Sequence, residues 1–380
     1  MGYLGNVRPT IALVADDIAD GAITTAKIAD DAVTGAKVGE ALSHRNVIIN
    51  GAMQVVQRGT PTASITGAGY HTCDRWHTYL SNCGTYTFSQ STTAPSDQGF
   101  TNSLKIDCTT ADASPASGDQ FYLRQMIEAQ YLQHLKKGTA NAETLVLTFW
   151  VRCNKTGNAT VELYEHDTPR SFCQTYTISS ANTWEQKTLT FAGDTTGVIA
   201  NDTGRGIDVR WWLDSGSNFT SGTQAASWAA PTNANRNTQN LGLASSTSNE
   251  FYVTGVQLEV GTATPYEHRS YAEELARCRR YYRRYGSAIQ GDVATSSTIE
   301  VGIVFDPPMR ATPNSVTLVT ATPSLTEVGT GGKTGSSSAL TNNGTTDRGS
   351  FVNINGFSGL NVGRGMISYT SDILAYDAEL

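Results

Sequence analysis

Hydrophobic and polar residues alternate in short runs along most of the chain, which is the period of β-strands that bury one face. Between residues 46 and 264 each run has the length of a strand and is bounded by Gly, Asn, Asp, Ser or Pro, as in a β-sandwich. The predicted strands span residues 47–49, 145–152, 160–164, 187–191, 206–213 and 250–260. Two interpretations stay open for residues 122–137, where apolar residues recur at helical steps but YLRQMIE also fits a strand.

A turn and a basic helix are predicted after residue 260. Ser270 stands three residues before Glu273, which is the spacing of a capping box at a helix N-terminus. Apolar residues then recur at three- and four-residue steps, arginines fill the remaining positions, and Gly286 suits a left-handed C-cap. We therefore expect a helix over residues 270–285, with Leu275 and Tyr282 on an apolar face larger than one helix can hide.

Strand-like patterning resumes after residue 287. The predicted strands span residues 297–305, 315–320, 351–354, 365–369 and 373–380. Residues 329–350, GTGGKTGSSSALTNNGTTDRGS, are the most polar and glycine-rich run of the chain. We expect an exposed loop there, because the run has no apolar periodicity that would retain it for core packing.

Two copies of a decapeptide, ADGAITTAKI and ADDAVTGAKV, occupy residues 19–38. A period of five matches neither a single helix nor a coiled coil, and the segment is too small and polar to bury a core alone. It forms either a disordered linker or a narrow stalk in which identical chains share the apolar row, and the pattern leaves open whether the repeats are helical or extended. The residues of that row are Ile18, Ile23, Ile28, Val33 and Val38.

Composition and charge narrow the class of protein. Only 16% of the residues are charged, and Gly, Ser, Thr and Asn are abundant, as in turn-rich extracellular or structural β-proteins. The formal net charge of −7 argues against a nucleic-acid partner, because neutralising phosphates requires a basic surface. The chain starts without a secretory pattern and contains no run of about 20 apolar residues. We expect no membrane insertion and synthesis in the cytoplasm.

No residue pattern predicts catalysis, a cofactor or a metal. The six cysteines have no C-x-x-C spacing, so we expect buried free thiols. HTCDRWH at residues 71–77 contains potential ligands but lacks a second ligand pair, and we expect a strand in which Trp76 packs inward. No two carboxylates are grouped as a glycan hydrolase requires. We therefore predict that the protein is not an enzyme.

The segment GIDVRWWLDSG contains the best candidate for a sugar contact in the central region. Because successive strand residues face opposite sides, Asp208, Arg210 and Trp212 are predicted to share the face opposite the core. A tryptophan among charged residues could stack on a sugar, with Asp and Arg binding its hydroxyls. The alternative is that Trp212 is covered by a neighbouring subunit or by the loop at residues 214–240. Trp228 in that loop has the same ambiguity.

Several stretches resemble one class of proteins. They are the N-terminal decapeptides, NVIINGAMQVVQRG followed by DRW, VQLEVG followed by PYEHRSYxEELAxCRRYY, and VFxxPMRATP. These sequence motifs are similar to those of bacteriophage tail fibres and related virion proteins, in which a jelly-roll domain precedes a terminal β domain. NVIINGAMQ, LVLTFWVRC, TWEQKTLTF and FYVTGVQLEVG are also similar to jelly rolls of the carbohydrate-binding-module type.

Pattern and resemblance together predict an all-β protein of four parts. Residues 1–45 form a tail anchor and extended stalk, residues 46–268 a jelly-roll β-sandwich, residues 269–286 a short basic helix, and residues 287–380 a C-terminal β domain. The resemblance implies a homotrimeric adhesin in the virion tail that docks to a tail or adaptor protein through its N-terminus. It would bind a host surface glycan or protein. A virion-associated glycan depolymerase and a purely architectural tail or capsid decoration protein remain alternatives.

Two surfaces compete as the receptor site. We favour the polar run at residues 329–350, with Asn342, Asn343, Asp347 and Arg348 as contacts, because an adhesive tip needs adaptable hydrogen-bonding groups. The face that contains Trp212 is the second choice.

Overall fold

The computed structural model describes residues 45–286, 289–335, 338–368 and 373–380. The chain divides into two units, Met1–Arg45 and Asn46–Leu380, and every element described below belongs to the second. The predicted stalk row of Ile18, Ile23, Ile28, Val33 and Val38 lies outside the described residues. The predicted domain boundaries at residues 268 and 286 stay predictions.

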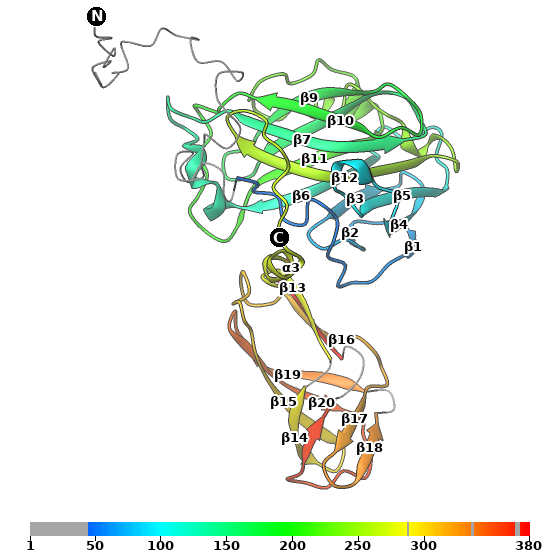
Figure 1. The fold of residues 1–380 in the computed structure, drawn as a ribbon, viewed down its shortest axis with the longest axis vertical. Helices are drawn as coiled ribbons and strands as arrows, with labels where there is room; N and C mark the ends of the chain where they lie inside the picture. The colour runs from blue at the N-terminus through cyan, green and yellow to red at the C-terminus, as the bar shows by residue number, and fades with distance from the viewer. Residues whose placement is uncertain (1–44, 287–288, 336–337, 369–372) are drawn as a thin grey trace, which may run out of the picture. The chain divides into compact units, whose positions relative to one another are not determined.

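Two six-stranded antiparallel sheets form the central β-sandwich (Figure 1). The first sheet has the order β1 (Thr62–Ile65), β4 (Thr85–Ser91), β5 (Ser103–Thr110), β12 (Glu250–Val260), β7 (Leu145–Cys153) and β10 (Glu185–Phe191). The second has the order β2 (Gly69–Tyr70), β3 (His77–Ser81), β6 (Gln120–Glu128), β11 (Arg205–Ser215), β8 (Gly157–Glu165) and β9 (Arg170–Ile178).

The chain crosses repeatedly from one sheet to the other, which makes the sandwich a jelly roll. Strand β12 lies between β5 and β7, and β11 lies between β6 and β8, so the late strands enter between earlier ones. The predicted all-β class is confirmed, and the strands predicted at residues 145–152, 160–164, 187–191, 206–213 and 250–260 are present. Residues 47–49 are not a strand, although Ile48 is fully buried in the core.

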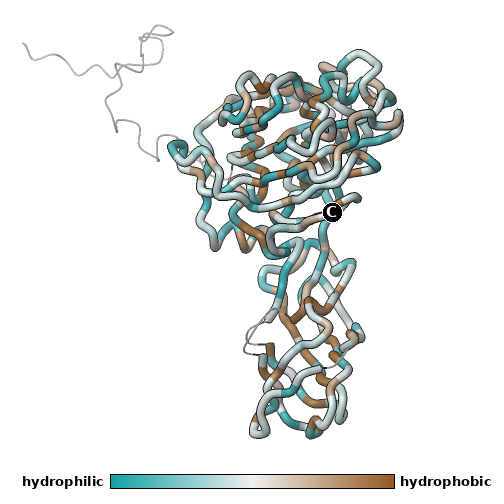
Figure 2. Tube along the Cα trace, turned by 90° about the vertical axis from the view of Figure 1, so that its right-hand side faces the viewer, coloured by the Kyte–Doolittle hydropathy of each residue, from teal (hydrophilic) through white to brown (hydrophobic). Residues whose placement is uncertain are grey.

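Alternate residues of both sheets point into one hydrophobic core. Trp211 lies at its centre, with its ring centroid 5.6 Å from that of Phe149 in the opposite sheet and 5.5 Å from that of Trp76. Trp76 therefore packs inward, as expected. Figure 2 shows the hydrophobic stretches along the strands in brown. Burying aromatic surface from both sheets holds them together.

Both interpretations of residues 122–137 hold in part. The strand β6 ends at Glu128, and a 3₁₀ helix, η5 (Ala129–Leu135), follows it. The other short helical turns of the sandwich lie in its loops. They are η4 (Ser96–Gln98), α2 (Ser217–Thr220), η6 (Asn233–Asn235) and η7 (Leu243–Ser245).

The predicted basic helix is shorter than its pattern indicates. Helix α3 (Tyr271–Arg279) begins where expected, because the Ser270 side chain accepts a hydrogen bond from the Glu273 amide. The helix ends before residue 280, however, and Tyr282–Tyr285 form strand β13, which pairs with β22 (Leu374–Asp377). Pairing with a strand distant in sequence outweighs the local helical period, so the predicted C-cap at Gly286 is wrong.

The apolar face of α3 is partly covered by its own chain. Leu275 packs beside a cluster that contains Val55, Cys278 and Tyr281, and the Tyr282 ring lies under the Arg58 guanidinium at 3.6 Å. Both Leu275 and Tyr282 are half-buried. Part of each side chain stays exposed, and the expectation that other copies of the chain cover this face stays a prediction.

The C-terminal region contains two more antiparallel sheets. The smaller has the order β13, β22 and β16 (Ser315–Leu318). The larger has the order β18 (Gly331–Thr334), β17 (Ser324–Glu327), β21 (Gly365–Ile367), β14 (Gln290–Thr295), β15 (Thr298–Val304), β20 (Gly349–Asn355) and β19 (Ala339–Thr345). Residues 329–350 are thus not one loop, because they contain β18, β19 and the start of β20. Backbone pairing, which tolerates polar side chains on an open face, produces these strands.

Buried ion pairs join the C-terminal residues to the sandwich. Glu379 pairs with Arg75, and their side chains are 4% and 1% exposed. Arg58 contacts Glu379 as well, with Nη2 3.4 Å from Oε1. Nearby, Glu128 accepts hydrogen bonds from Arg280 and Tyr281. The last strand is therefore anchored by charges removed from water.

All six cysteines are buried and unpaired, as expected for free thiols. In the part of the chain that the structure describes, no helix has the length and apolar character needed to cross a membrane. Within the same residues, no three His, Cys, Asp or Glu side chains are grouped as a metal site. Asp74 accepts hydrogen bonds from the backbone and side chain of Gln57 instead.

Candidate functional site

The predicted contact Trp212 is not accessible for stacking on a sugar. Its strand alternates as expected, with Trp211 in the core and Trp212 on the opposite face, but the Trp212 side chain is 0% exposed. It packs against Tyr122 and Phe219 and donates a hydrogen bond from Nε1 to Glu162 at 3.0 Å. Phe219 comes from the loop at residues 214–240, so that loop covers Trp212, as the alternative interpretation held.

Asp208 and Arg210 are also buried, in a network of charges. The Asp208 carboxylate contacts three guanidinium groups, and Arg210 is 4% exposed. Burial disfavours the ionised form of Asp208, but Arg210, His166 and Arg124 outweigh burial and hold the pKa well below its ordinary value. Neither side chain is free to bind sugar hydroxyls, so this part of the predicted site is wrong. Trp228 is half-buried, with Nε1 bound to the Ala192 carbonyl.

The four residues favoured at positions 329–350 lie on one strand and the turn that follows it, outside the lining of the groove described below. Asn342 and Asn343 are exposed on β19, where a bulge breaks the pairing with β20. The Asn342 side chain supports this bulge by accepting hydrogen bonds from Gly344 and Thr345. Asp347 and Arg348 form the following turn, and their carbonyls accept hydrogen bonds from Met309 and Phe305. They remain exposed or partly exposed but are engaged in holding this turn.

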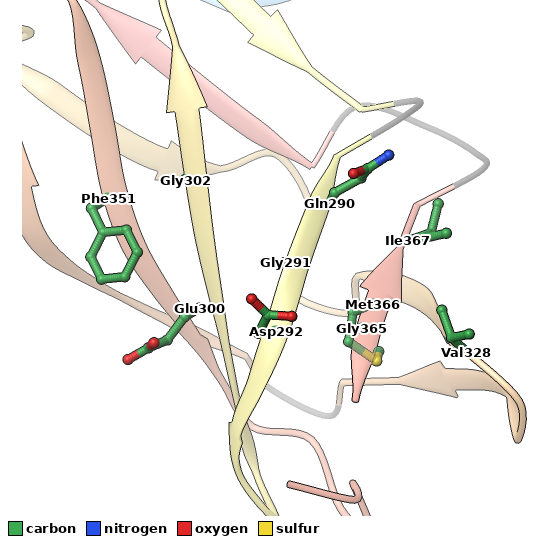
Figure 3. Close-up of a pocket in the computed structure, with 10 residues that line it drawn as sticks. All are labelled: Gln290, Gly291, Asp292, Glu300, Gly302, Val328, Phe351, Gly365, Met366 and Ile367. Atoms are coloured by element: carbon green, nitrogen blue, oxygen red, sulfur yellow. The ribbon is translucent and has the colours of Figure 1, made fainter. Parts of the chain in front are cut away.

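An open groove of about 530 Å³ lies on the larger C-terminal sheet (Figure 3). Its position follows from the two-residue period of the strands. Val293, Val301 and Val352 point into the core below, so Asp292, Glu300 and Phe351 lie on the opposite face. The lining residues are Gln290, Gly291, Asp292, Glu300, Gly302, Val328, Phe351, Gly365, Met366 and Ile367.

One aromatic ring stands free at this groove. Phe351 is 46% exposed, and its partners on the neighbouring strands are both glycines, Gly302 and Gly344. A Cβ atom at Gly302 would lie 3.8 Å from the ring, and one at Gly344 would meet nothing within 4 Å. With no side chain at either position, the strands leave bare backbone on both sides of Phe351.

Two carboxylates lie on neighbouring strands beside the ring. Asp292 on β14 is the direct cross-strand partner of Glu300 on β15 (Figure 3). Like charges in such a pair are destabilising. Among the described residues, neither carboxylate forms an ion pair. Gln290, two residues before Asp292, adds an amide on the same face. An arrangement that costs stability without supporting the core is typical of a binding surface.

This groove was not predicted, although the sequence contains a signal for it. In F-V-N-I-N, Phe351 shares its face with Asn353 and Asn355 and not with Val352 and Ile354. An aromatic residue out of phase with the apolar positions indicates an exposed ring. Treating residues 351–354 as an ordinary closing strand concealed it. The partners of Phe351 on the neighbouring strands depend on register and are not visible in the sequence.

Comparisons with known proteins give fold likeness only. No family model and no curated protein sequence matches the chain. Three similar solved structures are the enzymatically active domain of tailspike protein 4 from bacteriophage CBA120, a putative sugar binding protein from Bacteroides thetaiotaomicron, and a cyclase from Fischerella sp..

The likenesses to these three structures are weak. The tailspike domain matches with 12% identity and a TM-score of 0.31, covering 57% of this chain and 21% of the tailspike chain. The sugar binding protein matches with 14% identity and a TM-score of 0.31, covering 57% of this chain and 100% of the other. The cyclase matches with 15% identity and a TM-score of 0.32, covering 59% and 98%. Matches of this size do not assign a function.

Proposed function

We propose that the protein is a tail-fibre adhesin that binds a surface glycan at the groove around Phe351. The exposed Phe351 ring beside the unpaired Asp292 and Glu300 carboxylates is the observation on which the proposal rests. The resemblance of the sequence to phage tail fibres supports it independently. In this role, the fold serves as a rigid scaffold for an exposed polar surface.

The groove chemistry suits a neutral or amino sugar. The C–H face of a sugar ring can stack on Phe351, while its hydroxyls donate hydrogen bonds to Asp292 and Glu300. Hydrogen bonds to charged groups contribute about 1.5–3 kcal/mol each. The Gln290 amide can both donate and accept. Two carboxylates without a neighbouring cation would repel uronic acids and sugar phosphates, so these sugars are disfavoured at this groove.

Replacing Phe351 by alanine is expected to weaken glycan binding at least about tenfold, which corresponds to about 1.4 kcal/mol of stacking. The measurement is binding of the purified variant to an immobilised panel of bacterial surface polysaccharides. The variant should remain folded, because the ring is about half exposed. Tyr271→Ala is the matched control, since Tyr271 is a 56% exposed aromatic residue on α3 outside the groove. Equal binding by both variants would refute the proposal.

A homotrimer is the assembly proposed for this adhesin, attached to a tail or adaptor protein through its N-terminus. Three groove copies on one particle would raise avidity without any new contact, since single polar sites bind weakly. Analytical ultracentrifugation of the full chain is expected to give three times the mass of one chain. A monomer at micromolar concentration would contradict this part of the proposal.

A glycan depolymerase is the second candidate, because Asp292 and Glu300 are cross-strand neighbours and a glycosidase uses a pair of carboxylates. Binding without cleavage is favoured, since Asp292 is exposed and Glu300 only half-buried. A fall in chain length of the bound polysaccharide, abolished by Glu300→Gln, would favour the depolymerase.

A further inference from the structure

A second group of charged residues lies on the outer face of the second sandwich sheet, where β3, β6, β11 and β8 pair side by side. Asp208 Oδ2 is 2.8 Å from Arg205 Nη2, 2.8 Å from Arg210 Nη2 and 3.1 Å from Arg124 Nη1. Arg236 adds a fourth guanidinium group, which contacts Glu162 at 2.8 Å. Arg210 also lies 3.5 Å from Glu162.

The group carries more positive than negative charge. Four guanidinium groups contact two carboxylates, Asp208 and Glu162, which leaves an excess of two positive charges. Among the described residues, no other carboxylate pairs with these arginines. The whole chain has a formal net charge of −7, so this face differs in sign from the rest of the molecule. An uncompensated arginine pair is a typical oxyanion site.

Part of this charge reaches solvent. The Arg205 side chain is 30% exposed through the end of its guanidinium group, whereas its Nε is buried and has no hydrogen-bond partner among the described residues. Arg124 is 10% exposed at the side chain and donates from Nε to His77 Nδ1 at 3.2 Å. Burial and the nearby Arg124 lower the pKa of His77 to about 3, so His77 is neutral at neutral pH and adds no charge to this group.

The borders of the charged face are aromatic. Tyr79 and Tyr164 are half-buried, with Tyr79 stacked on Tyr122 and Tyr164 lying 4.1 Å from the Arg210 guanidinium. These rings hold the arginines in fixed positions, and preorganised guanidinium groups lose less entropy on binding. The arrangement therefore combines an anion contact with apolar edges against which a sugar ring can lie.

We propose that Arg205 is the contact residue of a second carbohydrate site, with Arg124 adding positive charge behind it, and that this site binds an oxyanion carried on a sugar, either a uronic acid carboxylate or a sugar phosphate. This site lies on a different sheet from the Phe351 groove and has the opposite charge, so it selects ligands that the groove disfavours. The two sites together would let one chain recognise a surface polysaccharide with alternating neutral and acidic sugars.

The test uses the full chain and isothermal titration calorimetry with three probes: trigalacturonate, mannose 6-phosphate and neutral trigalactose. Arg205→Gln removes the exposed guanidinium, while Asp208 keeps Arg124, Arg210 and His166, so the fold should persist. Arg279→Gln, at an exposed position on α3, removes the same charge elsewhere. The affinity for each anionic probe should also fall as the salt concentration rises from about 50 to 500 mM, because salt screens exposed charges.

We expect the unaltered chain to bind at least one anionic probe. The affinity for that probe should fall about tenfold in Arg205→Gln and stay unchanged in Arg279→Gln and Phe351→Ala. The probe that binds tells whether a carboxylate or a phosphate is recognised. Absence of binding by both anionic probes would overturn the proposal. Equal losses in the two arginine variants, or loss in Phe351→Ala, would do the same. Loss of binding in Phe351→Ala would place the anion at the groove. Failure of the second site can therefore be distinguished from failure of the Phe351 groove.

Discussion

Replacing Glu379 by alanine is expected to lower the free energy of unfolding by about 3–5 kcal/mol, because the change leaves a buried guanidinium without its carboxylate. Arg75 is 1% exposed, donates to the Met126 carbonyl at 2.6 Å, and lies 3.5 Å from the Tyr281 ring. None of these neighbours carries negative charge. Without Glu379, the positive charge of Arg75 would remain in a low-dielectric site with partial compensation only.

The measurement is the urea midpoint of unfolding, followed by tryptophan fluorescence. Glu143→Ala is the matched control, since Glu143 pairs with Lys136 at 2.5 Å with side chains 33% and 55% exposed. A surface pair of this kind contributes about 0–1 kcal/mol. The double variant Arg75→Met with Glu379→Leu should recover most of the stability, because apolar residues can replace a buried ion pair. Equal midpoints for Glu379→Ala and Glu143→Ala would show that the buried ion pair contributes no more stability than the surface pair.

Trp212→Ala should lower the free energy of unfolding by about 3–5 kcal/mol, as expected for truncation of a buried tryptophan. The change empties a site between Tyr122 and Phe219 and removes the Nε1 donor of the buried Glu162. The loop at residues 214–240 would lose its main aromatic contact with the sheet. The same measurement of unfolding applies, together with the glycan-binding assay on the folded fraction.

Binding to a neutral glycan should stay unchanged in this variant, because Trp212 does not reach the surface. Trp184→Ala is the control, since Trp184 is half-buried with its ring 6.2 Å from that of Tyr252. It should cost less stability than Trp212→Ala. Loss of glycan binding with normal stability in Trp212→Ala would mean that the covering loop opens and that Trp212 contacts the ligand.

Features that depend on residues close together along the chain could be predicted from the sequence. Two-residue alternation predicted β7, β8, β10, β11 and β12, the last with its observed bounds, but not β9, and the all-β class follows from these strands. Ser270 and Glu273 predicted the start of α3, since a cap needs only local spacing. Alternation also assigned Trp211 and Trp212 to opposite faces correctly.

Which of these faces meets solvent depends on how distant segments pack in the folded chain. The pattern around Trp212 is polar, yet the loop that contains Phe219 and Arg236 covers it, and no local rule predicts where a distant loop packs. Residues 282–285 have a helical period but form a strand that pairs with residues 374–377, about 90 positions further along the sequence. The groove depends on the register that places Phe351 between Gly302 and Gly344. Pairing between strands far apart in sequence sets that register, so the exposed ring and the carboxylates beside it become one surface only in the folded chain.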